Sequence, residues 1–306
     1  MISTRDAFGE ALAEIGNREN IFVLDGDLSD ATRTQYFGKI YKDRFFPIGI
    51  AEQNMIGVAA GLALSNKIPI VSSFATFCPL RCIDQIRSLI APNRLNVKII
   101  STHAGITTGA DGLSHQAIED IAIMKALPNF VIVSPADATE TKRALTAIIE
   151  YEGPVYMRLY RMEIPVLYNM DYDFEIGKGN ILREGKDVAI ISTGVAVSES
   201  LEAAKILKGK GIDASVVNIS TIKPIDYDLI SKIAKNVNAI ITVEDHNIIG
   251  GLGSSVADVL ACGETKIKFK KLGVQDRFGE SGDPKLLIKK HGFDAESIAR
   301  TAGELL

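Results

Sequence analysis

The sequence has few cysteines, little excess charge of either sign and no long apolar run. Its 306 residues include three cysteines and carry a formal net charge of −4, with both signs mixed along the chain. So few cysteines, in an odd number, argue against a disulfide-stapled secreted protein and predict a reducing, cytoplasmic setting. The lack of a basic excess argues against a nucleic acid or a membrane surface as the main partner. No apolar run reaches the roughly 18–20 residues that span a bilayer.

A targeting signal and a zinc motif are also missing from the sequence. The opening stretch, MISTRDAFGEALAEIG, predicts a capped amphipathic helix and has neither the basic n-region nor the apolar h-region of a signal peptide. Cys78 and Cys82 are four residues apart, but no second pair of Cys or His completes a zinc-ligand set. We therefore predict that these cysteines serve packing and that the chain holds no metal ion by itself.

Short β-rich segments alternate with helix-like segments through the first half. The β-rich segments have apolar character on both faces, which is typical of strands buried in a parallel sheet: NIFVLDGDL, FFPIGI, IPIVSSF, NVKIISTH and FVIVSP. A further strand is expected near 154–160. Helix-like stretches lie between several strands, at residues 51–65, 79–91, 116–126 and 137–150. This order predicts an α/β fold with a doubly wound parallel sheet, flanked by helices.

The second half repeats this rhythm after an interruption. Residues 162–186 have weak periodicity, and the alternation restarts at Asp187. Helices are expected at 195–209, 226–235, 251–261 and from about 294. We predict a first domain at 1–165, a linker at 166–186 and a second, smaller doubly wound α/β domain at 187–306.

Charged and polar residues gather at the predicted ends of the first-domain strands. In an open parallel sheet, ligands bind outside the carboxyl ends of the strands. Any one of these residues is better explained as a helix cap or a satisfied polar contact, but several segments with polar groups at one rim predict a binding site. The residues are Asp25, Asp27, Glu52, Ser72, Ser73, His103, Asp111 and His115.

Glu52 lies in FFPIGIAEQNMIGVAAGLALSN, a segment that is otherwise suited to burial. A buried carboxylate costs several kcal/mol unless a partner compensates it. Phe74 and Phe77 are three residues apart, so one helical turn would place both rings on a common face. Spacing alone favours the core for both rings. The alternative is a flat heteroaromatic ligand that stacks on a phenylalanine near a buried glutamate.

Two further features suit anions but also have structural explanations. The glycines in STGVAVSE and NIIGGLGSSVADVL can hold a phosphate at a helix N-terminus, or only allow close strand–helix packing. Neither stretch matches a dinucleotide fingerprint or a P-loop. Arg5, Arg158 and Arg161 suit phosphate through their several donors, although a surface arginine is usually solvated. His246, in VEDHNIIGG, is expected to be structural more often than functional.

Several of these segments together resemble a known family. GIAEQNM followed by GVAAGLALS, then SSFATF, RCIDQIR, THAGITTGADGLSHQ and GPVYMRLYR, resemble the pyrimidine-binding and C-terminal domains of transketolase. The resemblance covers nearly the whole chain and is closest to the separate C-terminal subunit of split, two-chain transketolases. It implies a thiamine diphosphate-dependent transferase that moves a two-carbon ketol unit from a ketose phosphate to an aldose phosphate.

The resemblance also implies roles at the cofactor. Glu52 matches the glutamate that bonds N1′ of the thiamine aminopyrimidine. A carboxyl that shares a proton with N1′ favours the imino tautomer and so activates the cofactor. Phe77 matches the ring stacked on the aminopyrimidine, Phe74 an apolar wall of the pocket, and Asp27 an acidic neighbour.

Further roles are implied in the substrate channel. His103 and His115 match its two histidines, which complete the catalytic set with Glu52. Asp111 matches the aspartate that reads the C2 hydroxyl configuration of the sugar. Arg5 and Arg161, with His103, match the binders of the terminal phosphate.

Three positions depart from the family pattern. A small hydroxyl residue that contacts the phosphate is replaced by Ala31, an acidic neighbour of Asp111 by Ala110, and an aromatic by Leu80. These changes leave cofactor activation intact but leave a sulfonated sugar open as the donor, because a singly charged sulfonate needs fewer donors than a phosphate. Three nearby hydroxyl residues are candidate substitutes at the head group: Ser29, Thr32 and Thr34.

The diphosphate end of the cofactor needs a Gly-Asp-Gly motif followed about 30 residues later by Asn, and the sequence lacks this pattern. The resemblance therefore implies a partner, an N-terminal transketolase subunit, that holds the diphosphate with Mg²⁺ or Ca²⁺. An α2β2 assembly is expected. The small residues of 51–65 permit close approach, so self-association through this helix is predicted.

Two alternatives stay open on the sequence. One is another thiamine enzyme, either a 2-oxo-acid dehydrogenase β-subunit or a deoxyxylulose-phosphate-synthase-like fragment. The other is a non-catalytic dimerising or regulatory protein on the same fold. The set of His103, Asp111, His115 and Arg161 favours sugar phosphates over acyl transfer, and Glu52 with Phe77 favours catalysis.

Overall fold

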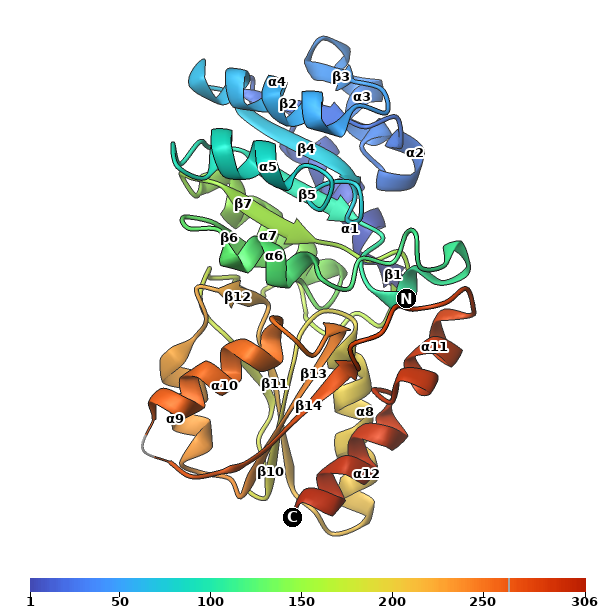
Figure 1. The fold of residues 1–306 in the computed structure, drawn as a ribbon, viewed down its shortest axis with the longest axis vertical. Helices are drawn as coiled ribbons and strands as arrows, with labels where there is room; N and C mark the ends of the chain where they lie inside the picture. Colours follow the sequence, from blue (N-terminus) through green and yellow to red (C-terminus); the bar gives the residue numbers. More distant parts are fainter. Residues whose placement is uncertain (264) are drawn as a thin grey trace.

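The computed structural model describes residues 1–263 and 265–306, which form two α/β sheets stacked end to end along the long axis (Figure 1). The first sheet has seven strands in the order β12-β6-β7-β5-β4-β2-β3. Six of them are parallel, and β12 runs antiparallel to β6. The strands are β2 (Ile21–Asp25), β3 (Phe45–Pro47), β4 (Ile68–Phe74), β5 (Lys98–Thr102), β6 (Val131–Val133), β7 (Val155–Arg158) and β12 (Thr221–Lys223).

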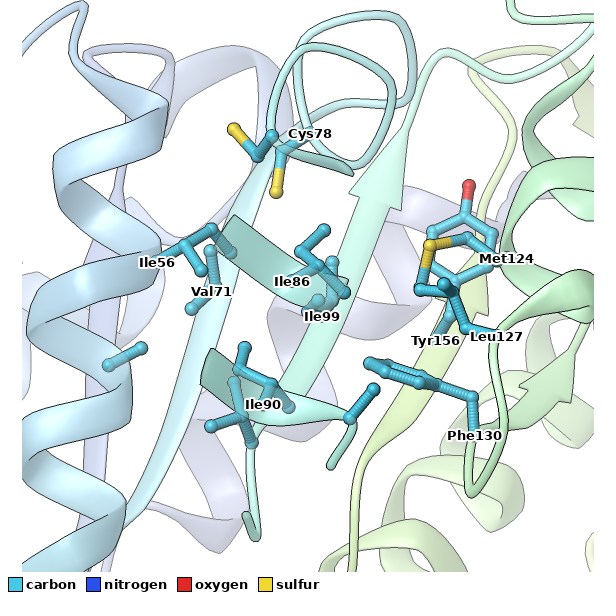
Figure 2. Packing of buried hydrophobic residues seen from close by; sticks show 14 of the residues in the cluster. Ile56, Val71, Cys78, Ile86, Ile90, Ile99, Met124, Leu127, Phe130 and Tyr156 are labelled. Atoms are coloured by element: carbon cyan, nitrogen blue, oxygen red, sulfur yellow. The ribbon is translucent and has the colours of Figure 1, made fainter. Parts of the chain in front are cut away.

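Helices cover both faces of this sheet because its central strands are apolar on both sides. Alternate residues such as Ile99 and Ile100 belong to opposite cores. One core packs against α1 (Thr4–Ile15), α3 (Gln35–Ile40) and α7 (Ala138–Glu150). The other packs against α4 (Glu52–Leu64), η2 (Ile86–Ile90) and α6 (Asp120–Ala126), as Figure 2 shows around Ile86, Ile99 and Tyr156. Cys78 and Cys82 lie in that core, so their predicted packing role is confirmed.

The second sheet has five strands in the order β14-β13-β10-β11-β9, with only β9 antiparallel to its neighbour. Helices α8 (Ala196–Gly209), α11 (Pro284–His291) and α12 (Ala295–Leu305) pack on one face. Helices α9 (Tyr227–Ala234) and α10 (Leu252–Cys262) pack on the other. The strands are β9 (Asn180–Arg183), β10 (Val188–Ser192), β11 (Ala214–Asn218), β13 (Ala239–Asn247) and β14 (Lys268–Val274). The predicted α/β class, with two doubly wound units, is confirmed.

The structure differs from the expected elements in two stretches. Residues 79–91 are not one α-helix: a short α5 (Ile83–Gln85) runs into the π-helical η2, where Ala91 N bonds Ile86 O across five residues. Residues 116–119 are not helical either, because Ala117 accepts hydrogen bonds from Gly105 N and from the Arg158 guanidinium.

The remaining short elements are β1 (Ile2–Ser3), which pairs with β8 (Glu163–Ile164), and α2 (Ser29–Thr32), η1 (Lys42–Arg44) and η3 (Ile106–Asp111).

No helix in the described part of the chain is both long enough and apolar enough to cross a membrane.

Candidate active site

The sequence-predicted site residues lie at one rim of the seven-stranded sheet. Asp25 is the last residue of β2, Phe74 is the last residue of β4, and His103 directly follows β5. Because these strands are parallel and adjacent, their carboxyl ends meet at the same edge. Glu52 joins them as the first residue of α4, where a negative charge is favoured by the helix dipole.

Glu52 is 2% exposed, and two side chains compensate its carboxylate. Ser73 Oγ donates to Oε1 over 3.1 Å, and Arg81 Nη1 lies 2.9 Å from Oε2. A Cβ on Gly26 would lie 3.4 Å from Oε1, so the backbone after β2 closes over the carboxylate. Each oxygen makes one of these bonds and retains a lone pair for a further donor.

Arg81 was not singled out from the sequence. Its guanidinium carbon lies 4.6 Å from the centre of the Phe77 ring while Nη1 bonds Glu52, so it joins the carboxylate to the aromatic cluster. The sequence did contain a signal for Arg81, because Phe77 and Arg81 are four residues apart. Side chains at that spacing on a helical turn share a face.

The aromatic side chains form a continuous stack beside Arg81. Phe77 and Phe74 are stacked with ring centres 5.6 Å apart, and His103 stacks on Phe74 at 3.8 Å. His115 meets both phenylalanines edge-on, at 5.9 Å from Phe74 and 5.3 Å from Phe77. The spacing-based expectation of a common face is confirmed for the two rings. Phe74 is buried, whereas Phe77 keeps partial exposure.

His103 connects this stack to an arginine. Arg5 Nη1 lies 3.4 Å from His103 Nε2, and because arginine only donates, Nε2 is the acceptor. The ring proton is then on Nδ1, which donates to Thr102 Oγ1 over 2.8 Å. Burial, and then the positive charges of Arg5 and Arg161, lower the pKa of His103 to about 3. The imidazole is therefore neutral at physiological pH. We call Glu52, Arg81, Phe77, Phe74, His103 and Arg5 the rim row.

The lowered pKa of His103 predicts a pH effect on stability. The folded chain does not take up this proton until about pH 3, whereas the unfolded chain takes it up below about 6.5. This difference in proton uptake does not affect the free energy of unfolding above pH 6.5. As the pH falls from 6.5 toward 3, it lowers the free energy of unfolding by up to about 1.4 kcal/mol per pH unit. Between pH 7.5 and 5.0, we expect the wild type to lose about 2 kcal/mol more unfolding free energy than His103→Gln, measured by urea unfolding. An equal loss in both proteins would contradict the prediction.

The predicted anion-binding residues form a cationic group at the end of the rim row. Arg5 also donates to Ala31 O over 3.0 Å, and its pKa is lowered by burial and by the nearby charges of Arg33 and Arg161. Arg161 forms an ion pair with Asp111 at 3.0 Å. The structure therefore brings Arg5, His103 and Arg161 together. Asp111 lies beside them, with one carboxylate oxygen engaged.

The structure shows that two suggested substitutes for the missing hydroxyl at Ala31 are engaged elsewhere. Thr32 Oγ1 and Thr34 Oγ1 both donate to the buried Asp25 carboxylate, at 2.8 Å and 2.7 Å. Asp25 also accepts from Leu28 N, so it organises the turn after β2. Asp27 is exposed in that turn, with φ of 65°. Neither threonine has its hydroxyl free to donate to a head group.

The glycine-rich turns of the second sheet serve packing, so the phosphate alternative is wrong for α10. Leu252 N and Gly253 N, at the N-terminus of that helix, donate to the buried Glu244 carboxylate at 2.7 Å and 2.8 Å. A Cβ on Gly194 would lie 2.1 Å from the Tyr160 hydroxyl, which requires glycine for close packing. His246 is fully buried, donates from Nδ1 to Asn247 O, and accepts from Ala122 N, as expected of a structural histidine.

Across residues 1–263 and 265–306, no group of three or more His, Cys, Asp or Glu side chains is placed to hold a metal ion.

Two family models match most of the chain. The family model of the transketolase pyrimidine binding domain matches residues 1–166, and that of the transketolase C-terminal domain matches residues 177–298. A Methanocaldococcus jannaschii protein described as a transketolase C-terminal section is 50% identical over 299 residues, which cover 97% of this chain and 94% of that protein.

A subunit of the 6-deoxy-6-sulfo-D-fructose transketolase of Clostridium sp. strain MSTE9 is 39% identical over 303 residues, covering 98% of this chain and 94% of its own. A solved split gene transketolase, an inactive β4 tetramer, is 46% identical and matches 100% of this chain and 99% of its own with a TM-score of 0.93. The chain therefore belongs to the transketolase family, in which it corresponds to the C-terminal subunit of a split enzyme.

Proposed function

We propose that this chain, together with a partner subunit, transfers a two-carbon ketol unit from a ketose phosphate or a sulfonated ketose to an aldose phosphate. The observation that carries the proposal is the rim row. It runs without a break from a buried carboxylate, through stacked aromatic rings, to a neutral histidine beside an arginine. One end suits a heteroaromatic cofactor and the other end suits an anionic sugar.

The residues present fit the aminopyrimidine half of thiamine diphosphate. Glu52 retains acceptor capacity on both oxygens and would accept from or share a proton with N1′. Phe77, with Phe74 behind it, offers a partly exposed ring for stacking. When bound, thiamine diphosphate supplies the electron sink that this carbon–carbon chemistry requires. His103, stacked on Phe74, and His115, edge-on to both phenylalanines, would hold or move protons on the sugar hydroxyls.

The diphosphate end is proposed to lie on an N-terminal transketolase subunit, with Mg²⁺ or Ca²⁺. This chain lacks the Gly-Asp-Gly motif with its downstream Asn, and split transketolases divide the enzyme between two chains. We further propose an α2β2 assembly in the cytoplasm, with the pyrimidine-binding domain at 1–165, a linker at 166–186 and the C-terminal-like domain at 187–306. The last part of that linker includes β9, which pairs with β11 at the edge of the second sheet.

Self-association is proposed through α4. Ile50, two residues before α4, and Leu64, its last residue, are 80% and 72% exposed. A Cβ on Gly57 or Gly61 would meet no atom within 4 Å. An exposed face with apolar and small residues allows a second copy to approach closely. Light scattering of the chain alone tests this, since a monomer would contradict it.

The head group of the donor sugar is proposed to bind at Arg5, His103 and Arg161. The hydroxyls of Thr32 and Thr34 are engaged by Asp25, and Ala31 offers only its carbonyl to Arg5. The charges of Arg5 and Arg161 are therefore proposed to hold the anion, with Ser29, half-buried at the start of α2, as the remaining hydroxyl candidate. Both a phosphate and a sulfonate satisfy this chemistry, so the donor has to be identified by experiment.

Reconstitution tests the proposed function. The chain is mixed with its partner subunit, thiamine diphosphate and Mg²⁺, and is given xylulose 5-phosphate or 6-deoxy-6-sulfofructose with an aldose phosphate acceptor. We expect formation of the ketose that is two carbons longer than the acceptor, dependent on both subunits. The donor with the higher kcat/KM identifies the head group. Turnover of pyruvate without ketol transfer would contradict the proposal.

A further inference from the structure

One buried carboxylate of the second sheet reaches the rim of the first. Asp245, on β13, accepts hydrogen bonds from Ile106 N at 2.9 Å, Thr107 N at 3.2 Å and Thr107 Oγ1 at 2.6 Å. It is fully buried. Its donors open the η3 segment, which begins three residues after His103. A side chain from the second sheet thus anchors a loop of the first.

The loop backbone is shaped to receive this carboxylate. Gly105 has a φ of 75°, and a Cβ at that position would lie 2.1 Å from Asp245 Oδ2. Both the positive φ and the close approach require glycine. The turn at Gly105 therefore presents the next two backbone N–H groups to Asp245, in the manner of an anion-binding nest.

Other contacts tie the same loop to its surroundings. Thr108 Oγ1 donates to His103 O over 2.7 Å, so the η3 turn and the histidine are directly linked. Gln116 Nε2 donates to both Ile106 O and Glu280 O. Helix α11, in red, packs against η3, which belongs to the green loop at the junction of the two sheets (Figure 1). A displacement at Asp245 is therefore transmitted to His103.

We propose that Asp245 is a positioning residue for the substrate, through which the second domain holds the loop that carries His103 and Asp111. This inference rests on the proposed function, which places those two residues on the sugar and its head group. Among the described residues, the side chain of Asp245 bonds Ile106 and Thr107, which belong neither to the rim row nor to Asp111. It acts by fixing the backbone between them.

The adjacent residue provides a matched control. Glu244 is equally buried on β13 and also accepts two backbone N–H groups, but these belong to α10 of its own domain. Glu244→Gln and Asp245→Asn make the same carboxyl-to-amide change at neighbouring positions of one strand. Only the second change reaches the loop of the first sheet, because in either orientation the new amide N–H₂ opposes a donor of Ile106 or of Thr107.

Hydrogen exchange of the chain alone tests the anchoring. In Asp245→Asn, we expect the amides of Ile106 and Thr107 to exchange about tenfold faster or more, because local opening controls their protection. In Glu244→Gln, we expect those amides to be unchanged and the amides of Leu252 and Gly253 to exchange faster. Unchanged protection of residues 106 and 107 in Asp245→Asn would overturn the proposal.

Kinetics of the reconstituted enzyme test the positioning. We expect Asp245→Asn to raise KM for the anionic donor sugar about tenfold, with kcat changed by less than about threefold, because the loop binds substrate rather than activating the cofactor. Glu244→Gln should leave KM unchanged. An unchanged KM in Asp245→Asn would overturn the role on the substrate, whereas a wild type without ketol transfer would refute the proposed function alone.

A milder variant covers the case in which Asp245→Asn does not fold. Thr107→Val removes one donor to Asp245 while both backbone donors stay, so we expect a KM increase in the same direction and of about threefold. Combined with Asp245→Asn, its effect should be less than additive, because both changes act on one contact. Full additivity, or no effect of Thr107→Val on KM, would overturn the proposal.

Discussion

Replacement of Glu52 by Gln is expected to reduce kcat of the reconstituted enzyme by about three orders of magnitude while the chain stays folded. The amide has the same shape and keeps an oxygen for Ser73 Oγ or for Arg81, but it cannot share a proton with the aminopyrimidine. Arg81 lies at the surface with its side chain 46% exposed, so water solvates it when its partner is lost. Steady-state kinetics with xylulose 5-phosphate and thermal unfolding of the chain measure the two effects.

Glu140→Gln is the matched control for this experiment. Glu140 is also a buried glutamate, but it accepts from Ala136 N and from Asn218 Nδ2, between the two sheets and away from the rim row. We expect Glu140→Gln to lower stability and to leave kcat unchanged. If Glu52→Gln retained kcat within tenfold of the wild type, the assignment of Glu52 to the cofactor would be wrong.

The order of the elements was readable from the sequence because each central strand is apolar on both faces. Such a pattern allows few structures other than a parallel sheet covered by helices. The antiparallel strands β12 and β9 were not foreseen. β12 has only three residues and pairs with β6 across about 90 positions of sequence, so no local pattern marks it. The π-helical turn of η2 was missed for a related reason, since its residues have the same apolar spacing as an α-helix.

The site was partly predictable because parallel strands bring their carboxyl ends to one edge. This rule placed Glu52 and His103 together, and the structure joins them in one row of contacts through Arg81, Phe77 and Phe74. What the rule does not give is the partner of each side chain. The sequence indicated that the Glu52 carboxylate needs a compensating partner. It did not indicate that the partner is Arg81, because that contact depends on the direction of a long, flexible side chain.

The glycine-rich turn before α10 shows the opposite case. The sequence pattern predicted that its backbone N–H groups converge, but it did not predict which group they bind. Its backbone N–H groups do converge on acceptor oxygens, but these belong to the side-chain carboxyl of Glu244. Asp245, one residue later, fills the equivalent turn at Gly105 in the other domain. Acidic residues in VEDHN therefore cap two turns on opposite sides of β13.

The largest effect on stability is expected at Asp120, which neutralises the buried Arg158. Asp120 Oδ2 accepts from Arg158 Nε at 2.8 Å and from the Tyr156 hydroxyl at 2.6 Å, and both charged side chains are fully buried. In Asp120→Asn the guanidinium keeps only neutral acceptors, namely Tyr160 Oη and the carbonyl oxygens of Ala117 and Asp245. Because an unpaired buried charge is left, we expect a loss of about 3–5 kcal/mol in the free energy of unfolding, measured in urea.

A half-exposed ion pair and a double variant make this prediction specific. Asp213→Asn breaks the pair with Arg183, whose side chains are 44% and 26% exposed, and should cost less than about 1 kcal/mol. Asp120→Asn combined with Arg158→Met should cost less than the sum of the single changes, since the second removes the charge that the first leaves unpaired. A loss below about 1 kcal/mol for Asp120→Asn would show that water reaches Arg158 in the folded chain. The junction between the two sheets, where Arg158 also bonds Asp245 O, would then be looser than the structure indicates.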